Sequence, residues 1–322
     1  MARYLVTGVA GFIGSNLARE LLRRGESVRG IDNFCTGKRE NLAGLDRLEL
    51  IEADLNDPGA CERACAGVEV VFHQAALPSV PRSVRDPIAS NHANVTATLA
   101  LLWAAKQAGV RRVLYAGSSS AYGSNPELPK REDMLPQPIS PYAVSKLAGE
   151  YYMRSFSQVY GLETVSLRYF NVFGPFQDPT SQYSGVMARF TLMMLRGEQP
   201  TIHGDGEQSR DFTFIENVVR ANLLAAAAPA GRVSGRVFNV ATGGRITLNH
   251  VWSELARLTG FKGEPQYGPD RAGDVKHSLA DIRAARDAFG YVPTVDFAEG
   301  LRRTVQWYRE LAPAKPARSD SF

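Results

Sequence analysis

The chain has 322 residues, of which 44% are hydrophobic and 22% charged, so it is long enough for about two domains and can fill a sizeable core. No apolar run approaches the roughly 18 residues that a membrane span needs, and the N-terminus MARYLVTGVAG lacks a signal-type apolar stretch. The net charge of +4 is spread along the chain without a basic block. These features argue against membrane and nucleic-acid partners and predict a globular protein of the cytoplasm.

Short apolar runs alternate with helical patterns along the first half of the chain. The apolar runs are RYLVTG, SVRGID, LELIEADL, VEVVFHQAA, RRVLYAGS and TVSLRYF. Helical patterns begin at Phe12 and cover residues near 58–66, 89–108 and 142–159. This alternation is typical of βαβ units. With the later strand VFNVAT, it predicts seven strands of a parallel, doubly wound α/β sheet of the Rossmann type with helices on both faces.

The pattern loosens after Gly174, where polar loops with glycine separate the helices. We expect a smaller α/β domain there, formed by residues 176–211 and 243–313, beside a large domain of residues 1–175. The segment 212–242, which holds a helical pattern and the strand VFNVAT, should return to the large domain. The tail 314–322, rich in proline, serine and charge, should be mobile.

A glycine loop follows the first predicted strand. TGVAGFIGSNL spaces Gly8, Gly11 and Gly14 as GxxGxxG at the start of a helix, with Phe12 and Ile13 inside the loop. Glycines there allow a tight turn and a close approach of the backbone, so that a pyrophosphate can sit on amide N–H groups at the positive end of the helix. The pattern predicts a dinucleotide-binding loop.

The second predicted strand ends in Asp32, 18 residues after Gly14, where a carboxylate can accept hydrogen bonds from an adenosine ribose. Because Asp32 also repels a 2′-phosphate, we expect NAD rather than NADP as the cofactor. Lys38 and Arg39 follow closely and leave open a site for that phosphate. Further cofactor contacts are predicted where the second to fourth strands end: Asn33, Asp54, Leu55, Gln74, Ala75 and Ala76. For Asp54 and Leu55 a surface turn is the alternative.

Tyr142 and Lys146 stand four residues apart on a predicted helix, so the ammonium can lie near the phenol. A free tyrosine, with a pKa of about 10, is a poor base at neutral pH. A neighbouring Lys⁺ and the positive nicotinamide of an oxidised cofactor would lower that pKa. Ser118 ends the predicted strand RRVLYAGS, where a parallel sheet presents catalytic groups beside its cofactor.

Cysteine and histidine form no metal pattern. Cys61 and Cys65 form a CxxxC on an expected helix with no histidine or second cysteine pair nearby, and Cys35 stands apart from them. The five histidines contain no i,i+4 pair. We therefore expect neither a metal site nor a disulfide.

The glycine loop, Asp32, Ser118 and the Tyr142–Lys146 pair together resemble the extended short-chain dehydrogenase/reductase family over nearly the whole chain. The resemblance implies that Ser118 and Tyr142 contact the hydroxyl being oxidised and that Lys146 binds the nicotinamide ribose and tunes Tyr142. Asn94 matches the family's asparagine on the helix facing the cofactor, with helix packing as the alternative. The family also implies a homodimer.

Within this family, nucleotide-sugar dehydratases carry Asp-Glu directly after the catalytic serine or threonine, to protonate a leaving hydroxyl and to remove the C5 proton. Here Ser119 and Ser120 occupy those positions, in AGSSSAYG. Neither hydroxyl can serve as a general acid near pH 7, so elimination lacks its acid and reversible oxidation at C4 remains.

Three later segments, LRYFNVFGP, GDGEQSRDF and DRAGDVKHSLAD, resemble nucleotide-sugar 4-epimerases, especially the bacterial UDP-N-acetylglucosamine/UDP-glucose type. The resemblance implies that Asn171, Arg210 and Arg271 bind the diphosphate and that Asp274 contacts the uridine ribose. Arginine forks suit phosphate oxygens, and the Asn171 amide can donate without adding charge.

Ser278 stands where epimerases restricted to UDP-glucose and UDP-galactose carry a tyrosine, so a 2-acetamido group would have room. As an alternative, Ser278 caps a helix LADIRAARDAFG. A UDP-glucuronate 4-epimerase and a simple nucleotide-sugar oxidoreductase are the competing activities.

Overall fold

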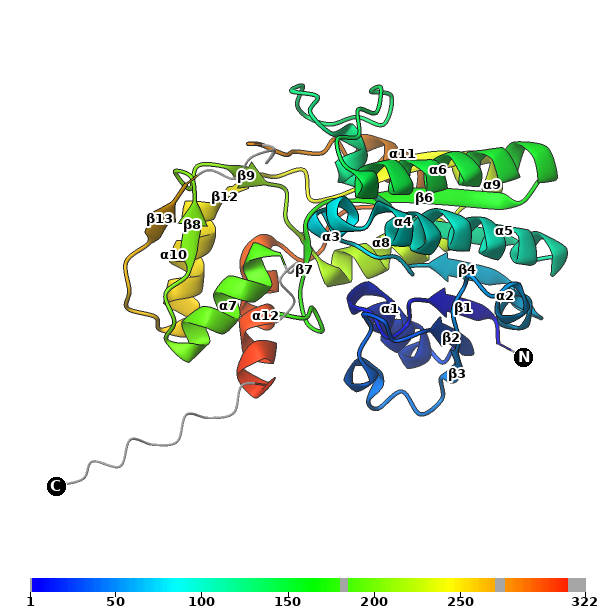
Figure 1. Cartoon of the computed structure of the whole chain (residues 1–322), viewed down its shortest axis with the longest axis horizontal. Helices are drawn as coiled ribbons and strands as arrows, with labels where there is room; N and C mark the ends of the chain where they lie inside the picture. Colours follow the sequence, from blue (N-terminus) through cyan, green and yellow to red (C-terminus); the bar gives the residue numbers. More distant parts are fainter. Residues whose placement is uncertain (1, 180–184, 270–275, 312–322) are drawn as a thin grey trace.

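The computed structural model describes residues 2–179, 185–269 and 276–311. Its centre is one seven-stranded, all-parallel sheet in the order β11-β6-β5-β4-β1-β2-β3 (Figure 1). This confirms the predicted Rossmann-type doubly wound fold. The strands are β1 (Tyr4–Thr7), β2 (Val28–Asp32), β3 (Glu49–Glu52), β4 (Val70–His73), β5 (Arg112–Ser118), β6 (Glu163–Tyr169) and β11 (Arg236–Val240).

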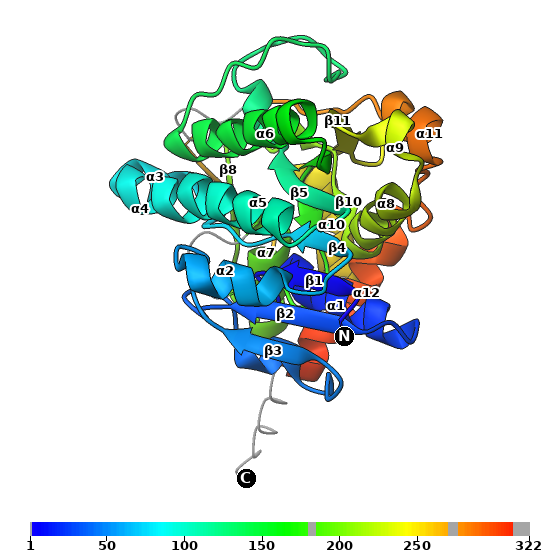
Figure 2. The same cartoon turned by 90° about the vertical axis from the view of Figure 1, so that its right-hand side faces the viewer.

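Helices cover both faces of the sheet because successive side chains of a strand point to opposite faces. On β4, for example, Val70 and Phe72 join the core under α1 and α8, whereas Val71 joins the core under α2, α5 and α6. The second group of helices lies on one side of the sheet and α8 on the other (Figure 2). These helices are α1 (Phe12–Arg23), α2 (Pro58–Cys65), α5 (Ala97–Gln107), α6 (Pro141–Tyr160) and α8 (Ile215–Ala227).

Shorter helices pack beside the large sheet and the helices that cover it: α3 (Val80–Arg85), α4 (Pro87–Asn91), α9 (Ala230–Val233) and α11 (Arg283–Phe289). The helix expected near 89–108 is interrupted. A π-helical stretch, His92–Thr96, separates α4 from α5. Asn94 lies in this stretch, where its side chain accepts a hydrogen bond from the Leu77 backbone at 2.7 Å.

A smaller group of elements packs beside the carboxyl ends of the sheet strands (Figure 1). It comprises α7 (Val186–Arg196), α10 (Leu248–Thr259) and α12 (Phe297–Leu311), with the strand pairs β8 (Thr201–His203) with β13 (Gln266–Gly268) and β9 (Ser209–Arg210) with β12 (Ile246–Thr247). A third pair, β7 (Val172–Phe173) with β10 (Thr213–Phe214), joins this group to the sheet. β11 lies in the large sheet, but the exact domain boundaries remain a prediction.

The strand order reverses between β1 and β4, which places a crevice at the carboxyl ends of these strands. Gly8 follows β1, Asp32 ends β2, Gln74 follows β4 and Ser118 ends β5. The fold therefore gathers, at one edge, residues that are up to 110 positions apart in the sequence. None of the helices in the described ranges is long and apolar enough to cross a membrane.

Candidate active site

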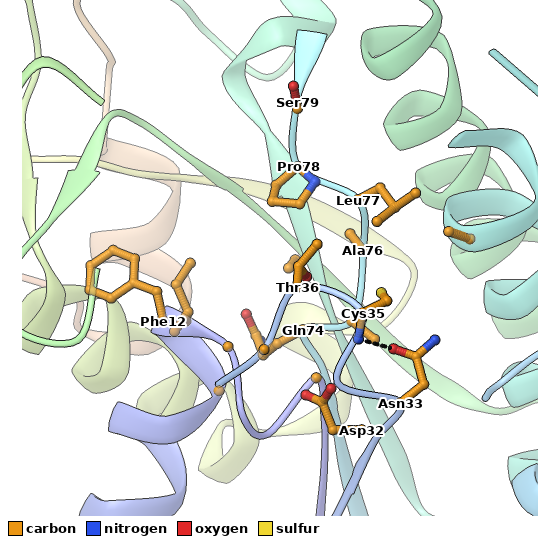
Figure 3. A pocket seen from close by; sticks show the side chains of 18 of the residues that line it. Phe12, Asp32, Asn33, Cys35, Thr36, Gln74, Ala76, Leu77, Pro78 and Ser79 are labelled. Carbon is orange, nitrogen blue, oxygen red and sulfur yellow. Dashed lines mark hydrogen bonds between the residues drawn. The ribbon is translucent and has the colours of Figure 1, made fainter. Parts of the chain in front are cut away.

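A cavity of about 590 Å³ opens at this crevice, a size that suits a small-molecule ligand (Figure 3). Predicted cofactor residues form much of its wall: Gly8, Gly11, Phe12, Ile13, Gly14, Asp32, Asn33, Asp54, Leu55, Gln74, Ala75, Ala76, Tyr142 and Lys146. Asn94 does not line it. Its buried amide lies one layer behind, where it bonds the Leu77 backbone and donates to the Ser145 hydroxyl at 3.0 Å. This position favours packing for Asn94.

Backbone crowding explains the glycines of the loop. Gly8 has φ +64°, and a Cβ there would stand 2.8 Å from the backbone of Ala75. A Cβ on Gly14 would lie only 2.1 Å from the Gly8 carbonyl oxygen. Neither position can carry a side chain without moving the loop, so the start of α1 stays open to a ligand. The residues therefore fit the pyrophosphate of a dinucleotide.

Asp32 fixes the loop and presents its carboxylate to the cavity. It is 8% exposed, and its oxygens accept hydrogen bonds from the backbone N–H groups of Ala10 at 2.9 Å and Phe34 at 2.8 Å. Burial raises the pKa of this carboxyl, and the two N–H groups oppose that rise. Each carboxylate oxygen keeps a second lone pair for a ribose hydroxyl.

The two cations that left the cofactor preference open are both paired. Lys38 forms an ion pair with Asp178 at 2.9 Å, and Arg39 forms one with Glu52 at 2.6 Å. Arg39 also stacks on Phe34, with 4.1 Å between the guanidinium carbon and the ring centre. A 2′-phosphate would have to compete with these carboxylates, so the arrangement favours NAD.

Asn33 and Asp54, which were predicted as cofactor contacts, belong to a small polar network. The Asn33 amide donates to Asp54 at 2.7 Å, and Asp54 accepts from the backbone N–H of Asn56 at 2.8 Å. Burial is the largest single influence and raises the pKa of Asp54, but these hydrogen bonds and one from the Asn56 side chain together lower it below its usual value. Further wall residues came from no sequence motif, because they lie in loops and in α3, which only the fold brings together: Thr36, Leu77, Pro78, Ser79, Arg82, Phe176, Gln177 and Asp178.

Helix α6 places Tyr142 and Lys146 in the wall of the cavity. Ser140 caps the helix by accepting from the Ala143 N–H at 3.2 Å, and Pro141 occupies the first helical position, so the helix begins one residue before Tyr142. The Tyr142 N–H donates to the Ser83 hydroxyl of α3 at 3.0 Å. This hydrogen bond and the capped helix start fix the backbone of Tyr142.

Burial raises the pKa of the Tyr142 phenol, and a side-chain hydrogen bond with Ser118 opposes part of that rise. Lys146 is 3% exposed, and burial lowers its pKa to about 8, with Glu150 acting in the opposite direction. Its ammonium lies 4.8 Å from the centre of the Tyr115 ring. Burial also lowers the pKa of His73 to about 3, so this imidazole is neutral. Ser118 thus hydrogen-bonds the Tyr142 phenol, and Lys146 follows Tyr142 by one helical turn in the wall of the same cavity.

The Ser118 hydroxyl is held by its neighbour. It accepts hydrogen bonds from the Ser120 hydroxyl at 2.8 Å and from the Ser120 N–H at 3.2 Å. Its own hydrogen is then available to another acceptor, such as Tyr142 or a substrate oxygen. Ser119 and Ser120 are half-buried in a short 3₁₀ turn directly after β5.

Asn171, Arg210 and Ser278, which were predicted to contact the nucleotide sugar, belong to segments that hydrogen bonds join, and we call these residues the sugar side. The Asn171 amide donates to the Ser278 hydroxyl at 3.3 Å and to the Asp211 carbonyl at 3.0 Å. Arg210 is half-buried and donates to the Lys276 carbonyl at 3.0 Å. Arg271 and Asp274 lie outside the described residues.

The alternative interpretation of Ser278 as a helix cap is wrong. Helix α11 begins at Arg283, and Ile282 is its N-cap residue. Ser278 instead belongs to an extended segment whose His277 bridges to Ser209, and its N–H donates to the Ser209 carbonyl at 3.0 Å. Ser278 therefore pairs with the Ser209 segment instead of capping a helix, and its hydroxyl accepts a hydrogen bond from the Asn171 amide.

No cluster of three His, Cys, Asp or Glu side chains that could hold a metal ion is found in the part of the chain that the structure describes. Cys61 and Cys65 are buried on α2, where burial raises the pKa of each thiol to about 12. Both are therefore unreactive thiols at neutral pH.

The fold and its glycine loop define a dinucleotide-binding protein of the doubly wound α/β class. The chain belongs to the NAD dependent epimerase/dehydratase family, whose pattern matches residues 4–241. This confirms the predicted family resemblance and NAD as the cofactor.

Three relatives show the range within the family. The chain is 40% identical to a UDP-glucose 4-epimerase of Mycolicibacterium smegmatis over 95% of this chain and 98% of the relative. It is 33% identical to a UDP-glucuronate 4-epimerase of Thermodesulfobacterium geofontis over 96% and 97%. The solved UDP-N-acetylglucosamine 4-epimerase of Methanobrevibacter ruminantium, in complex with UDP-N-acetylmuramic acid, matches with a TM-score of 0.92 and 40% identity over 97% and 99%.

Proposed function

We propose that this NAD-dependent enzyme is a UDP-sugar 4-epimerase, an isomerase that interconverts UDP-N-acetylglucosamine with UDP-N-acetylgalactosamine and UDP-glucose with UDP-galactose. The observation that carries the proposal is the grouping of Ser118, Tyr142 and Lys146 at the sheet edge with no acid in the two positions after Ser118. The relatives named above support a UDP-sugar 4-epimerase and differ in the sugar.

Tyr142 would take the proton from the sugar O4. NAD bound in the cavity would supply a reversible hydride acceptor for C4, so that oxidation to the 4-keto sugar and reduction from the other face need no outside redox partner. Ser118, held by Ser120, would hydrogen-bond the same oxygen. Lys146 would hold a positive charge near the phenolate, because burial leaves its pKa close to 8 rather than far below neutrality.

The serines after Ser118 decide what happens to the keto sugar. A dehydratase must protonate a leaving hydroxyl, and a serine hydroxyl cannot do so near pH 7. Ser119 and Ser120 can only form hydrogen bonds, as donors or acceptors, which would hold the sugar while it turns. Return of the hydride is then the reaction that remains.

Acceptance of the N-acetylated sugar rests on Ser278. Its small hydroxymethyl group contacts Asn171, one of the residues proposed to bind the substrate. A side chain of this size leaves space for a 2-acetamido group that a tyrosine would fill.

The second candidate is a UDP-glucuronate 4-epimerase, because a relative with that name is 33% identical along nearly the whole chain. It would need a cation or hydroxyls near C6 of the sugar. An NMR time course separates the candidates: purified protein is incubated with each UDP-sugar and no added cofactor. Conversion of UDP-N-acetylglucosamine supports the proposal. Conversion of UDP-glucuronate alone makes the second candidate correct, and a released 4-keto sugar indicates an oxidoreductase.

We also propose that two copies pair through α4, α5 and α6. Apolar side chains are exposed along these helices: Ile88, Leu99, Trp103, Val144, Tyr151, Val159 and Tyr160. Isologous pairing of such a surface with a second copy would bury it. Light scattering should give twice the mass of the 35.2 kDa chain, and Trp103→Glu should shift the protein toward monomer. A wild-type monomer would refute the homodimer. Residence in the cytoplasm stays a prediction.

A further inference from the structure

A fully buried carboxylate lies outside the proposed catalytic trio, on the sugar side. Asp211 is 0% exposed and directly follows Arg210. Burial raises the pKa of this carboxyl, and the hydrogen bonds that it accepts act in the opposite direction. A buried carboxylate is costly unless each oxygen is well bonded, so its partners indicate what holds it there.

The partners of Asp211 come from two other segments of the chain. Its Oδ1 accepts from the Thr242 N–H at 2.9 Å and from the Thr242 hydroxyl at 2.6 Å. Its Oδ2 accepts from the N–H groups of Gly243 at 3.0 Å and Ala280 at 3.3 Å. One carboxylate therefore ties the segment of Arg210 to the connection after β11 and to the segment that carries Ser278.

The main chain of Asp211 contacts the sugar residues themselves. Its carbonyl oxygen accepts from the Asn171 amide at 3.0 Å, and its N–H donates to the Ser278 hydroxyl at 3.4 Å. Arg210 precedes it in the chain. Asn171, Ser278 and Arg210 are thus each one hydrogen bond or one peptide bond from Asp211, whereas the wall of the NAD cavity does not include it.

Only a carboxylate suits this environment. Three of the four donors are backbone N–H groups, and they approach both oxygens. An asparagine would turn its NH₂ toward at least one of these N–H groups whichever way the amide is placed. Two facing donors repel each other, and the segment that carries one of them must move.

We infer that Asp211 is a positioning residue of the nucleotide-sugar site: it holds Ser278 and Arg210 in register with Asn171 and so sets the affinity and selectivity for the UDP-sugar. The inference rests on the proposed epimerase function. It places substrate affinity under the control of a side chain that does not touch the cofactor cavity.

Asp211→Asn tests the inference in the full-length enzyme. We expect KM for UDP-N-acetylglucosamine to rise about tenfold or more, kcat to change less than about threefold, and NAD affinity to stay unchanged, because only the sugar side loses its register. The ratio of kcat/KM between UDP-N-acetylglucosamine and UDP-glucose should also change. Asp57→Asn, the same chemical change at the cap of α2, should leave KM as in the wild type.

Thr242→Val keeps the test decisive where Asp211→Asn fails to fold. This variant removes one of the four hydrogen bonds and introduces no facing donor. It should raise KM about threefold, again without an effect on NAD affinity. An unchanged KM in the folded variants, or an equal loss of NAD and UDP-sugar affinity, would overturn the role of Asp211. A wild-type enzyme that converts no UDP-sugar would instead refute the proposed function.

Discussion

The cofactor side and the sugar side of this cleft are built in different ways. On the cofactor side, Gly8 lies in the turn after β1 and Gly14 in the first turn of α1, and Asp32 stands at the end of the neighbouring strand. On the sugar side, Asn171 and Ser278 are 107 positions apart and meet through a 3.3 Å hydrogen bond. The cofactor side thus depends on the regular sheet, and the sugar side depends on irregular segments held together by a few polar contacts.

This difference has a functional consequence. A regular sheet edge fixes the backbone that a constant ligand such as NAD requires. Extended segments joined by single bridges, such as the one between Ser209 and His277, can change without disturbing the sheet. Selectivity among UDP-sugars is therefore expected to reside on the sugar side. Variants on each side should then affect different measurements.

The largest effect is expected at the point where the two sides meet. Tyr142→Phe removes the proton acceptor and little packing volume, so epimerisation should fall by about a thousandfold, while NAD and UDP affinities stay within about threefold. NMR assays of quenched reactions measure the rate of epimerisation, and calorimetry measures the affinities for NAD and UDP. Activity within tenfold of the wild type would rule out Tyr142 as the base.

The hydroxyls of Ser118 and Ser120 should contribute differently to the rate of epimerisation. Ser118 contacts the phenol, whereas Ser120 contacts Ser118. Ser118→Ala should therefore lower kcat about a hundredfold, and Ser120→Ala less, about tenfold, with the thermal unfolding midpoint nearly unchanged in both. Equal losses in kcat would show that the two hydroxyls act as one network rather than in sequence.

Ser278→Tyr tests the selectivity of the sugar side alone. A phenol ring beside Asn171 should exclude the 2-acetamido group, so kcat/KM for UDP-N-acetylglucosamine should fall at least about a hundredfold. The value for UDP-glucose should fall less than about threefold, because a 2-hydroxyl needs no extra room. Equal losses for the two sugars would mean that Ser278 does not face C2.

The same division explains what the sequence could predict. Strand positions followed from buried apolar runs, and the glycine loop and Asp32 followed from local spacing, because each depends on neighbours along the chain or on the adjacent strand. The start of α11 at Arg283 did not follow, since cross-segment pairing of Ser278 overrode a good local capping signal. The contacts of Asp211 carry no local pattern, because their partners lie 31 and 69 positions away.

The Lys38–Asp178 ion pair could not be predicted from the sequence either, because its partners are far apart along the chain. It bears on the smallest predicted effect, which is the change in cofactor affinity. Asp32→Ala removes the carboxylate that would bind the ribose hydroxyls and repel a 2′-phosphate, so NAD affinity should fall about tenfold. NADP affinity should rise only about threefold, because Lys38 and Arg39 remain paired with Asp178 and Glu52. Adding Asp178→Ala to this variant removes the partner of Lys38 and should raise NADP affinity further.

Fluorescence titration of both cofactors measures these changes, with Ser278→Tyr as a control that should bind NAD as the wild type does. Co-purification of NADP with the wild-type protein, or NADP affinity that is the same with and without Asp178, would contradict this account of the preference.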